Sequence, residues 1–351
     1  MKKKIIGNNT LIPSQISFGG APLGELFENL TEENCNKTLN KCFELGIKLF
    51  DTSPFYGYGL SEKRLGDYLK TKNRNSFIIC TKVGRYLVPE QSENIDRGIF
   101  KGGLNFKPVI DYSYDGTMRS FEQSLKRLRL TEIDIALIHD VDFFTHGDLT
   151  EVYFKISMEG AYKALHKLKE QNLIKAIGVG LNDATMCTRF AHAGNFDCMM
   201  LANRYTLLEQ KALNDFFPIA KDKNISVLLA GVYNSGILIK GLKKDVTYEY
   251  APLTAEIKSK YLEIQKICSE FKIPIAAAAL QFANAPEVVS TLVLGMDKPF
   301  QVKKNNDLLK VSIDKDFWNM LKRKRLINEN SPTPSQYTSS FKFHKKFYMN
   351  L

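Results

Sequence analysis

Eight short apolar runs alternate along the chain with segments of helical periodicity, and this repetition limits the fold more than any other feature. Each run is continuously apolar, which suits a strand that is buried on both faces of a parallel sheet. Eight successive strand–helix units predict a single α/β domain, a (β/α)8 or TIM barrel. The expected strands are Gln15–Phe18, Lys48–Asp51, Ser76–Thr81, Ile133–Ile138, Lys175–Val179, Asp197–Leu201, Ser226–Ala230 and Val288–Val293.

Helical periodicity fills the segments between these strands. Thr31 is a preferred N-cap residue in front of an apolar face formed by Cys35, Leu39, Cys42 and Phe43. Further helices are expected to begin at Thr117 and Thr254. Near the start of the chain, the turn signal Gly7–Thr10 predicts a small hairpin that closes the bottom of the barrel.

Connection lengths also point to a barrel. Three strand-to-helix connections are long, namely 84–116, 140–154 and 231–253. Long loops in a compact domain are usually functional, and in this architecture they share the carboxyl-end rim, where barrel enzymes keep their chemistry. The barrel is expected to span residues 1–327. Residues 328–351 form a tail that either folds over the mouth or extends loosely.

Composition limits the classes of function. The net charge of +11 arises from scattered lysines, which form either a solvated surface or a field that attracts an anionic cofactor. Without a basic stripe, no nucleic-acid partner is expected. No apolar run reaches about 18 residues and no signal peptide is apparent, so no membrane partner and a cytoplasmic location are expected. The cysteines lack metal-ligand spacing, which predicts free thiols and no metal; the oligomeric state is left open.

Four polar side chains follow three consecutive predicted strands. Asp51 ends the second strand and Tyr56 follows it closely, whereas Lys82 and His139 come directly after the third and fourth strands. Alone, a histidine or lysine after an apolar run is more often structural. Because the carboxyl ends of neighbouring barrel strands share one rim, we expect these four side chains to lie close together.

This set of groups suits general acid–base catalysis at a carbonyl or hydroxyl. The reference pKa of a phenol is about 10, and a nearby ammonium favours the phenolate. Lys82 supplies that charge, and Asp51 keeps Lys82 charged and oriented. His139 hydrogen-bonds the reacting oxygen, so that Tyr56 donates a proton in reduction or removes one in oxidation.

The residues of this set resemble a known family signature. The stretch Phe50–Glu62, together with Thr81–Gly84 and Ile138–His139, is similar to the motifs of the aldo-keto reductase superfamily. The resemblance extends over roughly residues 10–310. It implies that the four residues are the catalytic tetrad of an oxidoreductase that moves a hydride between a nicotinamide cofactor and its substrate.

Further segments resemble one branch of this family, the aldose (L-fucose-like) and pyridoxal dehydrogenases. They are 81–85, 177–182, 204–210 and 234–236. The resemblance implies oxidation of the anomeric hydroxyl of an L-fucose- or D-arabinose-like aldose to a lactone. Three alternatives stay open: a pyridoxal 4-dehydrogenase, a general aldehyde or ketone reductase, and a nicotinamide-sensing regulatory barrel without catalysis.

The chain lacks a GxGxxG motif, so the cofactor is expected at the last loops of the barrel. The backbone N–H groups of Asn234, Ser235 and Gly236 are expected to bind the pyrophosphate. Asn182 is expected to contact the nicotinamide carboxamide. Common family members carry a Ser-Asn pair and a glutamine for that contact, whereas this chain has Gly180-Leu181-Asn182 and Ala202.

The adenosine end of the cofactor is expected at Gly295, Gln301 and Asn305. Typical NADPH-dependent members carry basic residues where this chain has Gly295 and Gln301. A 2′-phosphate needs arginine or lysine contacts, so this departure predicts NAD. Compensation by Lys298, Lys303 or Lys304 leaves NADP open.

Aromatic residues crowd the expected mouth and predict a pocket for a small sugar or aldehyde. The substrate candidates are Phe18, Phe55 and Tyr86, with Tyr58, Phe143 and Phe144 as further aromatics. Aromatic faces suit both sugar C–H surfaces and pyridine rings, although such residues also pack loops. Phe55 replaces a polar residue that is often found before the catalytic tyrosine of the aldose-oxidising branch, which makes the pocket less polar.

Overall fold

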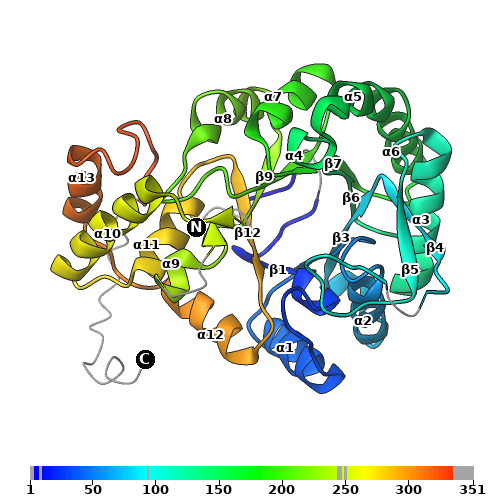
Figure 1. Ribbon diagram of the computed structural model, residues 1–351, viewed down its shortest axis with the longest axis horizontal. Coiled ribbons are helices and arrows are strands. Elements are labelled where there is room, and N and C mark those ends of the chain that lie inside the picture. Colours follow the sequence, from blue (N-terminus) through cyan, green and yellow to red (C-terminus); the bar gives the residue numbers. More distant parts are fainter. Residues whose placement is uncertain (1–3, 8–9, 93–94, 243–246, 249–250, 335–351) are drawn as a thin grey trace.

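The computed structural model contains one closed barrel of eight parallel strands surrounded by helices (Figure 1). It describes residues 4–7, 10–92, 95–242, 247–248 and 251–334. The strand order is β1-β12-β9-β8-β7-β6-β3-β2, as in a TIM barrel, and each of the eight predicted strands is present. The strands are β1 (Ile16–Gly19), β2 (Leu49–Asp51), β3 (Ile78–Val83), β6 (Ile135–His139), β7 (Ala176–Leu181), β8 (Cys198–Ala202), β9 (Ser226–Ala230) and β12 (Val289–Gly295).

Helices alternate with these strands along the chain and form the outer layer of the barrel (Figure 1). The helices are α1 (Glu32–Glu44), α2 (Leu60–Leu69), α3 (Tyr114–Leu128), α6 (Ala161–Glu170), α7 (Ala184–Ala193), α8 (Phe216–Asp222), α10 (Ala255–Glu270), α11 (Ile275–Asn284), α12 (Pro299–Leu308) and α13 (Lys315–Arg323).

Two of the predicted helix starts are confirmed and one is wrong. Thr31 and Thr254 each accept a hydrogen bond from the N–H three residues on, and they cap α1 and α10. Helix α3 starts at Tyr114 and not at Thr117, because the side chain of Ser113 caps it by accepting from Gly116 N–H. Thr117 is therefore a buried residue inside the helix.

The barrel has an inner and an outer core because successive strand residues point to opposite faces. A small cluster that includes Leu49, Cys80 and Leu137 fills the interior. Ile6 and Leu11 belong to the same cluster, and Ile6 N–H donates to the Leu11 carbonyl at 2.9 Å. These contacts place the N-terminal segment against the barrel interior, as the hairpin prediction requires, but its turn residues 8–9 lie outside the described residues.

The three long connections contain small elements and are not structureless. The first carries an antiparallel hairpin, β4 (Arg85–Pro89) and β5 (Phe106–Ile110), at the edge of the barrel beside α3 (Figure 1). The second carries α4 (Phe143–His146) and α5 (Thr150–Glu159). The third carries α9 (Ile237–Lys240) and the strands β10 (Thr247–Tyr248) and β11 (Ala251–Pro252).

The described part of the predicted tail ends at residue 334, and within it Ser331 is buried. Residues 335–351 lie outside the described residues, and the domain boundary at 327 stays a prediction. All six cysteines are buried free thiols. No group of metal-ligating side chains occurs among the described residues, nor is any helix there long and apolar enough to cross a membrane.

Candidate active site

A buried ion pair lies at the carboxyl ends of β2 and β3. Lys82 Nζ donates to the Asp51 carboxylate and, at 2.9 Å, to the carbonyl of Thr52. Burial by itself would lower the pKa of Lys82, but the neighbouring Asp51 and Tyr56 hold that pKa above its ordinary value. Lys82 is therefore a fixed ammonium in this part of the rim.

Tyr56 lies close to both Lys82 and His139. The ammonium of Lys82 is 5.5 Å from the centre of the Tyr56 ring, and the ring centres of Tyr56 and His139 are 6.1 Å apart. Close backbone packing fixes the loop that carries Tyr56, since a Cβ atom on Gly24 would lie 2.5 Å from the Tyr56 carbonyl carbon. The structure thus brings all four predicted tetrad residues together at one rim.

His139 is a buried, neutral imidazole at the end of β6. Burial and the positive charges of Arg85 and Lys82 hold its pKa well below the ordinary value. Its Nδ1 atom lies 3.3 Å from the hydroxyl oxygen of Ser53. A neutral imidazole has one N–H donor and one acceptor nitrogen, which suits it to orient a substrate oxygen.

This low pKa predicts a pH-dependent stability that His139→Gln removes. The unfolded chain protonates His139 near pH 6.5, whereas the folded chain does so only at lower pH. The stability present above pH 6.5 is therefore lost as the pH falls, and the variant should gain on the wild type by on the order of 1–2 kcal/mol near pH 5. Urea unfolding across this range measures the difference; a gap that does not change with pH would contradict a buried neutral His139.

Arg85 and Asp140 are functional candidates that the sequence reasoning missed. Arg85 Nη1 lies 3.1 Å from an oxygen of Asp140, and its guanidinium carbon is 4.9 Å from the centre of the Phe55 ring. Phe100, from the first long connection, packs edge-on against Phe55 at 5.6 Å between ring centres. Arg85 lies in the segment 81–85, which resembles the aldose and pyridoxal dehydrogenases, and Asp140 directly follows His139. The sequence therefore pointed to both positions.

Of the three substrate candidates, Phe55 alone lies beside the tetrad. The prediction for Phe18 is wrong, because strand alternation turns it into the outer core, 5.9 Å from Phe50. Tyr86 is also misplaced: it alternates with Arg85 along β4, and the Arg119 guanidinium stacks on its ring at 4.2 Å. The alternation that turns Tyr86 toward α3 turns Arg85 toward the mouth.

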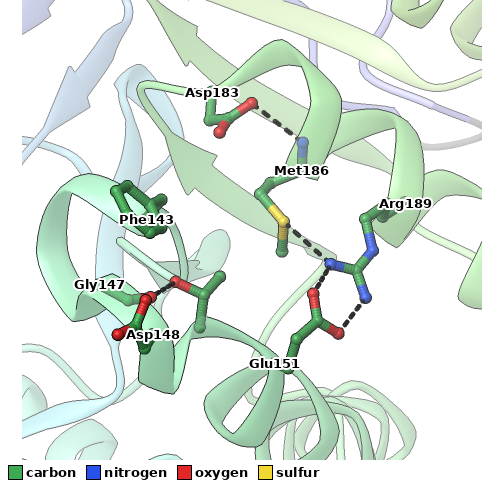
Figure 2. Close-up of a pocket in the computed structure, with 8 residues that line it drawn as sticks. Phe143, Gly147, Asp148, Glu151, Asp183, Met186 and Arg189 are labelled. Atoms are coloured by element: carbon green, nitrogen blue, oxygen red, sulfur yellow. Dashed lines mark hydrogen bonds and ion pairs between the residues drawn. The ribbon is translucent and has the colours of Figure 1, made fainter.

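The remaining aromatic candidates lie away from the reacting groups. The Tyr58 hydroxyl donates to the carbonyl of Asp96 at 3.1 Å. Phe143 and Phe144 are 65% and 80% exposed on α4. Phe143 lines a separate shallow pocket of about 350 Å³. Figure 2 shows Phe143 on one side of this pocket and the ion pair of Arg189 with Glu151 on the other. That pocket contains no residue of the tetrad.

The loop after β9, which contains Asn234, Ser235 and Gly236, matches only part of its predicted role in binding the pyrophosphate. The N–H groups of Asn234 and Gly236 donate to carbonyls within the turn, so they do not form the expected phosphate cradle. In contrast, the side-chain amide of Asn234 is buried and neither its oxygen nor its nitrogen has a partner among the described residues. Ser235 beside it is exposed. An unpaired buried amide fits a loop that binds a polar ligand.

One of the residues predicted to bind the adenosine end of the cofactor contacts this loop. Asn305 of α12 accepts a hydrogen bond at 2.7 Å from the hydroxyl of Tyr233, next to Asn234. The side-chain oxygen of Gln301 accepts from the N–H of Asp297 at 2.8 Å and thus stabilises its own helix start. Gly295 is exposed at the end of β12. Asn182 lies at the end of β7, where its carbonyl accepts from Arg204 at 2.6 Å.

Comparisons with known proteins identify the family to which the chain belongs. Residues 15–325 match the Aldo/keto reductase family. The chain is 35% identical over 338 residues to pyridoxal 4-dehydrogenase of Microbacterium luteolum, which covers 93% of this chain and 98% of that protein. D-threo-aldose 1-dehydrogenase of a Pseudomonas species is 34% identical over 325 residues, covering 91% and 95%.

Solved structures show the same fold. The glycerol dehydrogenase AKR11B4 from Gluconobacter oxydans aligns with a TM-score of 0.72 at 23% identity, covering 96% of this chain and 98% of that one. The holo form of aldo-keto reductase AKR11C1 from Bacillus halodurans gives 0.69 at 21% identity, with coverage of 96% and 98%. The chain therefore belongs to the aldo/keto reductase family, whose members are NAD(P)H-using oxidoreductases.

Proposed function

We propose that this chain is a dehydrogenase that oxidises the anomeric hydroxyl of an aldose, in its cyclic lactol form, to a lactone. One observation carries the proposal: Tyr56 lies close to both the fixed ammonium of Lys82 and the neutral imidazole of His139. The D-threo-aldose and pyridoxal dehydrogenases at 34% and 35% identity support a lactol substrate.

A bound nicotinamide would supply the hydride acceptor, and the side chains at the rim would transfer the proton. Tyr56 would take the proton of the anomeric hydroxyl, and the anomeric carbon would give up its hydride to the nicotinamide, which leaves the lactone carbonyl. Lys82 stabilises the phenolate that abstracts this proton, and Asp51 holds Lys82 in place. His139 donates a hydrogen bond to the reacting oxygen, which orients the substrate.

NAD is the proposed cofactor. Asn234 and Ser235 would bind it after β9, and Asn182 and Asn305 would bind it at the neighbouring loops. Two of the lysines that could compensate for Gly295 and Gln301 already have acidic partners. Lys298 lies 3.7 Å from Glu28, and Lys303 lies 2.6 Å from Asp307. Both pairs are exposed and therefore weak, so the support for NAD over NADP is the lack of a basic side chain at Gly295 and Gln301.

Pyridoxal is the second candidate substrate, since its hemiacetal is also a lactol. The rings of Phe55 and Phe100 beside Tyr56 favour a flat aromatic substrate. Phe55 stands where the aldose-oxidising branch often has a polar residue, so a simple hexose would lack a polar contact at this position.

The substrate can be identified with NAD and NADP offered separately against L-fucose, D-arabinose, L-galactose and pyridoxal, with the absorbance of the reduced nicotinamide as readout. We expect turnover of a sugar with NAD. If only pyridoxal is turned over, pyridoxal and not an aldose is the substrate. If the whole panel is inactive while the cofactor binds tightly, carbonyl reduction or a cofactor-sensing role replaces the proposal.

A further inference from the structure

The surroundings of His139 specify which of its ring nitrogens carries the proton. The hydroxyl oxygen of Ser53 lies 3.3 Å from Nδ1 and already accepts the N–H of Phe55 at 3.1 Å. Among the described residues, Nδ1 is the one acceptor within hydrogen-bonding distance of the Ser53 hydroxyl, so we assign Ser53 as the donor and Nδ1 as the acceptor. In a neutral imidazole, an acceptor at Nδ1 leaves the proton on Nε2.

The opposite side of the ring favours the same tautomer. Nε2 lies 3.5 Å from one oxygen of Asp140, and the other oxygen of Asp140 lies 3.1 Å from Arg85 Nη1. Burial raises the pKa of Asp140, and the charges of Arg85 and Lys82 oppose that rise. An ionised carboxylate attracts an N–H group at Nε2 and repels a lone pair there.

We propose that Ser53 and the Arg85–Asp140 ion pair are positioning residues that hold His139 as the neutral tautomer protonated on Nε2. The catalytic consequence rests on the proposed function, in which this N–H is the donor to the oxygen that Tyr56 deprotonates. The tautomer itself is a property of the free protein. Three residues outside the tetrad, Ser53, Arg85 and Asp140, thus act through His139.

The direct test is ¹⁵N NMR of the imidazoles in the full chain without substrate, with the signals of His139 assigned by their loss in His139→Gln. We expect a single tautomer protonated on Nε2 at neutral pH. In Ser53→Ala/Asp140→Asn, where both determinants are removed, the tautomer protonated on Nδ1 should appear. A wild-type His139 protonated on Nδ1, or a double variant with an unchanged spectrum, would overturn the proposal.

Asp134 offers a matched control for Asp140. It precedes β6 as Asp140 follows it, it is buried, and it also pairs with an arginine, with Arg74 at 2.7 Å. Asp134→Asn therefore perturbs a comparable buried pair at the other end of the same strand. We expect it to lower stability while the His139 signals stay unchanged. An equal change of the His139 signals in Asp134→Asn and Asp140→Asn would mean general loosening and overturn the proposal.

Kinetics with the substrate found in the panel provide a second readout. Asp140→Asn should lower kcat by roughly 10- to 100-fold, less than the roughly 10²–10⁴ for loss of an acid–base group, with KM within about twofold. Arg85→Lys should recover part of the kcat that Arg85→Met loses. Equal kcat in Arg85→Met and wild type would overturn the role of the pair. If no substrate is turned over but His139 is protonated on Nε2, the proposed function is wrong and the proposal on the tautomer is still supported.

Discussion

Replacement of Tyr56 by phenylalanine is expected to lower kcat by roughly 10²–10⁴-fold while cofactor binding is retained. The variant keeps the ring close to Lys82 and His139 and removes only the hydroxyl that exchanges the proton. The loop should keep its shape, because close backbone packing at Gly24 fixes it. Steady-state kinetics and a fluorescence titration with reduced cofactor measure the two effects separately.

Tyr68→Phe is the matched control for this variant. The hydroxyl of Tyr68 donates to Asn40 at 2.6 Å on the outer layer of the barrel, away from the tetrad. We expect kcat of this variant to stay close to that of the wild type. If Tyr56→Phe keeps wild-type turnover, Tyr56 is not the proton-transfer group and the mechanism is wrong.

Lys82→Met should abolish turnover and also destabilise the protein. Asp51 is buried, and in this variant its carboxylate loses its counter-charge. Removal of one partner of a buried ion pair typically costs roughly 3–5 kcal/mol of the free energy of unfolding. Urea unfolding and steady-state kinetics on the same preparation measure both losses.

The double variant Asp51→Asn/Lys82→Met separates stability from catalysis. It removes both charges, so we expect part of the lost stability to return while turnover stays absent. Recovery of turnover along with stability would show that Lys82 acts only through folding. A single variant as stable as the wild type would contradict the buried pair.

The barrel and the tetrad could be predicted because both depend on local sequence. Continuous apolar runs mark strands that are covered on both faces, and each of the eight runs became a strand. Asp51, Lys82 and His139 come at or just after strand ends, and the closed barrel brings neighbouring ends together. Their proximity therefore follows from topology alone.

The rest of the site depends on directions and partners that the pattern does not specify. The position of Phe18 in the chain predicts a place at the mouth, but strand alternation turns its side chain into the outer core. Strand alternation also turns Tyr86 toward α3, so that Arg85 and not Tyr86 faces the mouth of the barrel. The N–H groups of Asn234 and Gly236 are used within a turn, which composition does not reveal. The small elements of the long connections likewise arise from pairings between distant residues, such as Leu26 with Phe100.

The most direct test of the account is to follow the transferred hydrogen itself. The purified chain is given NAD and the aldose it turns over best, labelled with deuterium at the anomeric carbon, and the reduced cofactor is examined by mass spectrometry. Hydride transfer from the anomeric carbon predicts one deuterium in the nicotinamide and a lactone as the matching product. Reduced cofactor without deuterium, or a product other than the lactone, would contradict oxidation at the anomeric carbon.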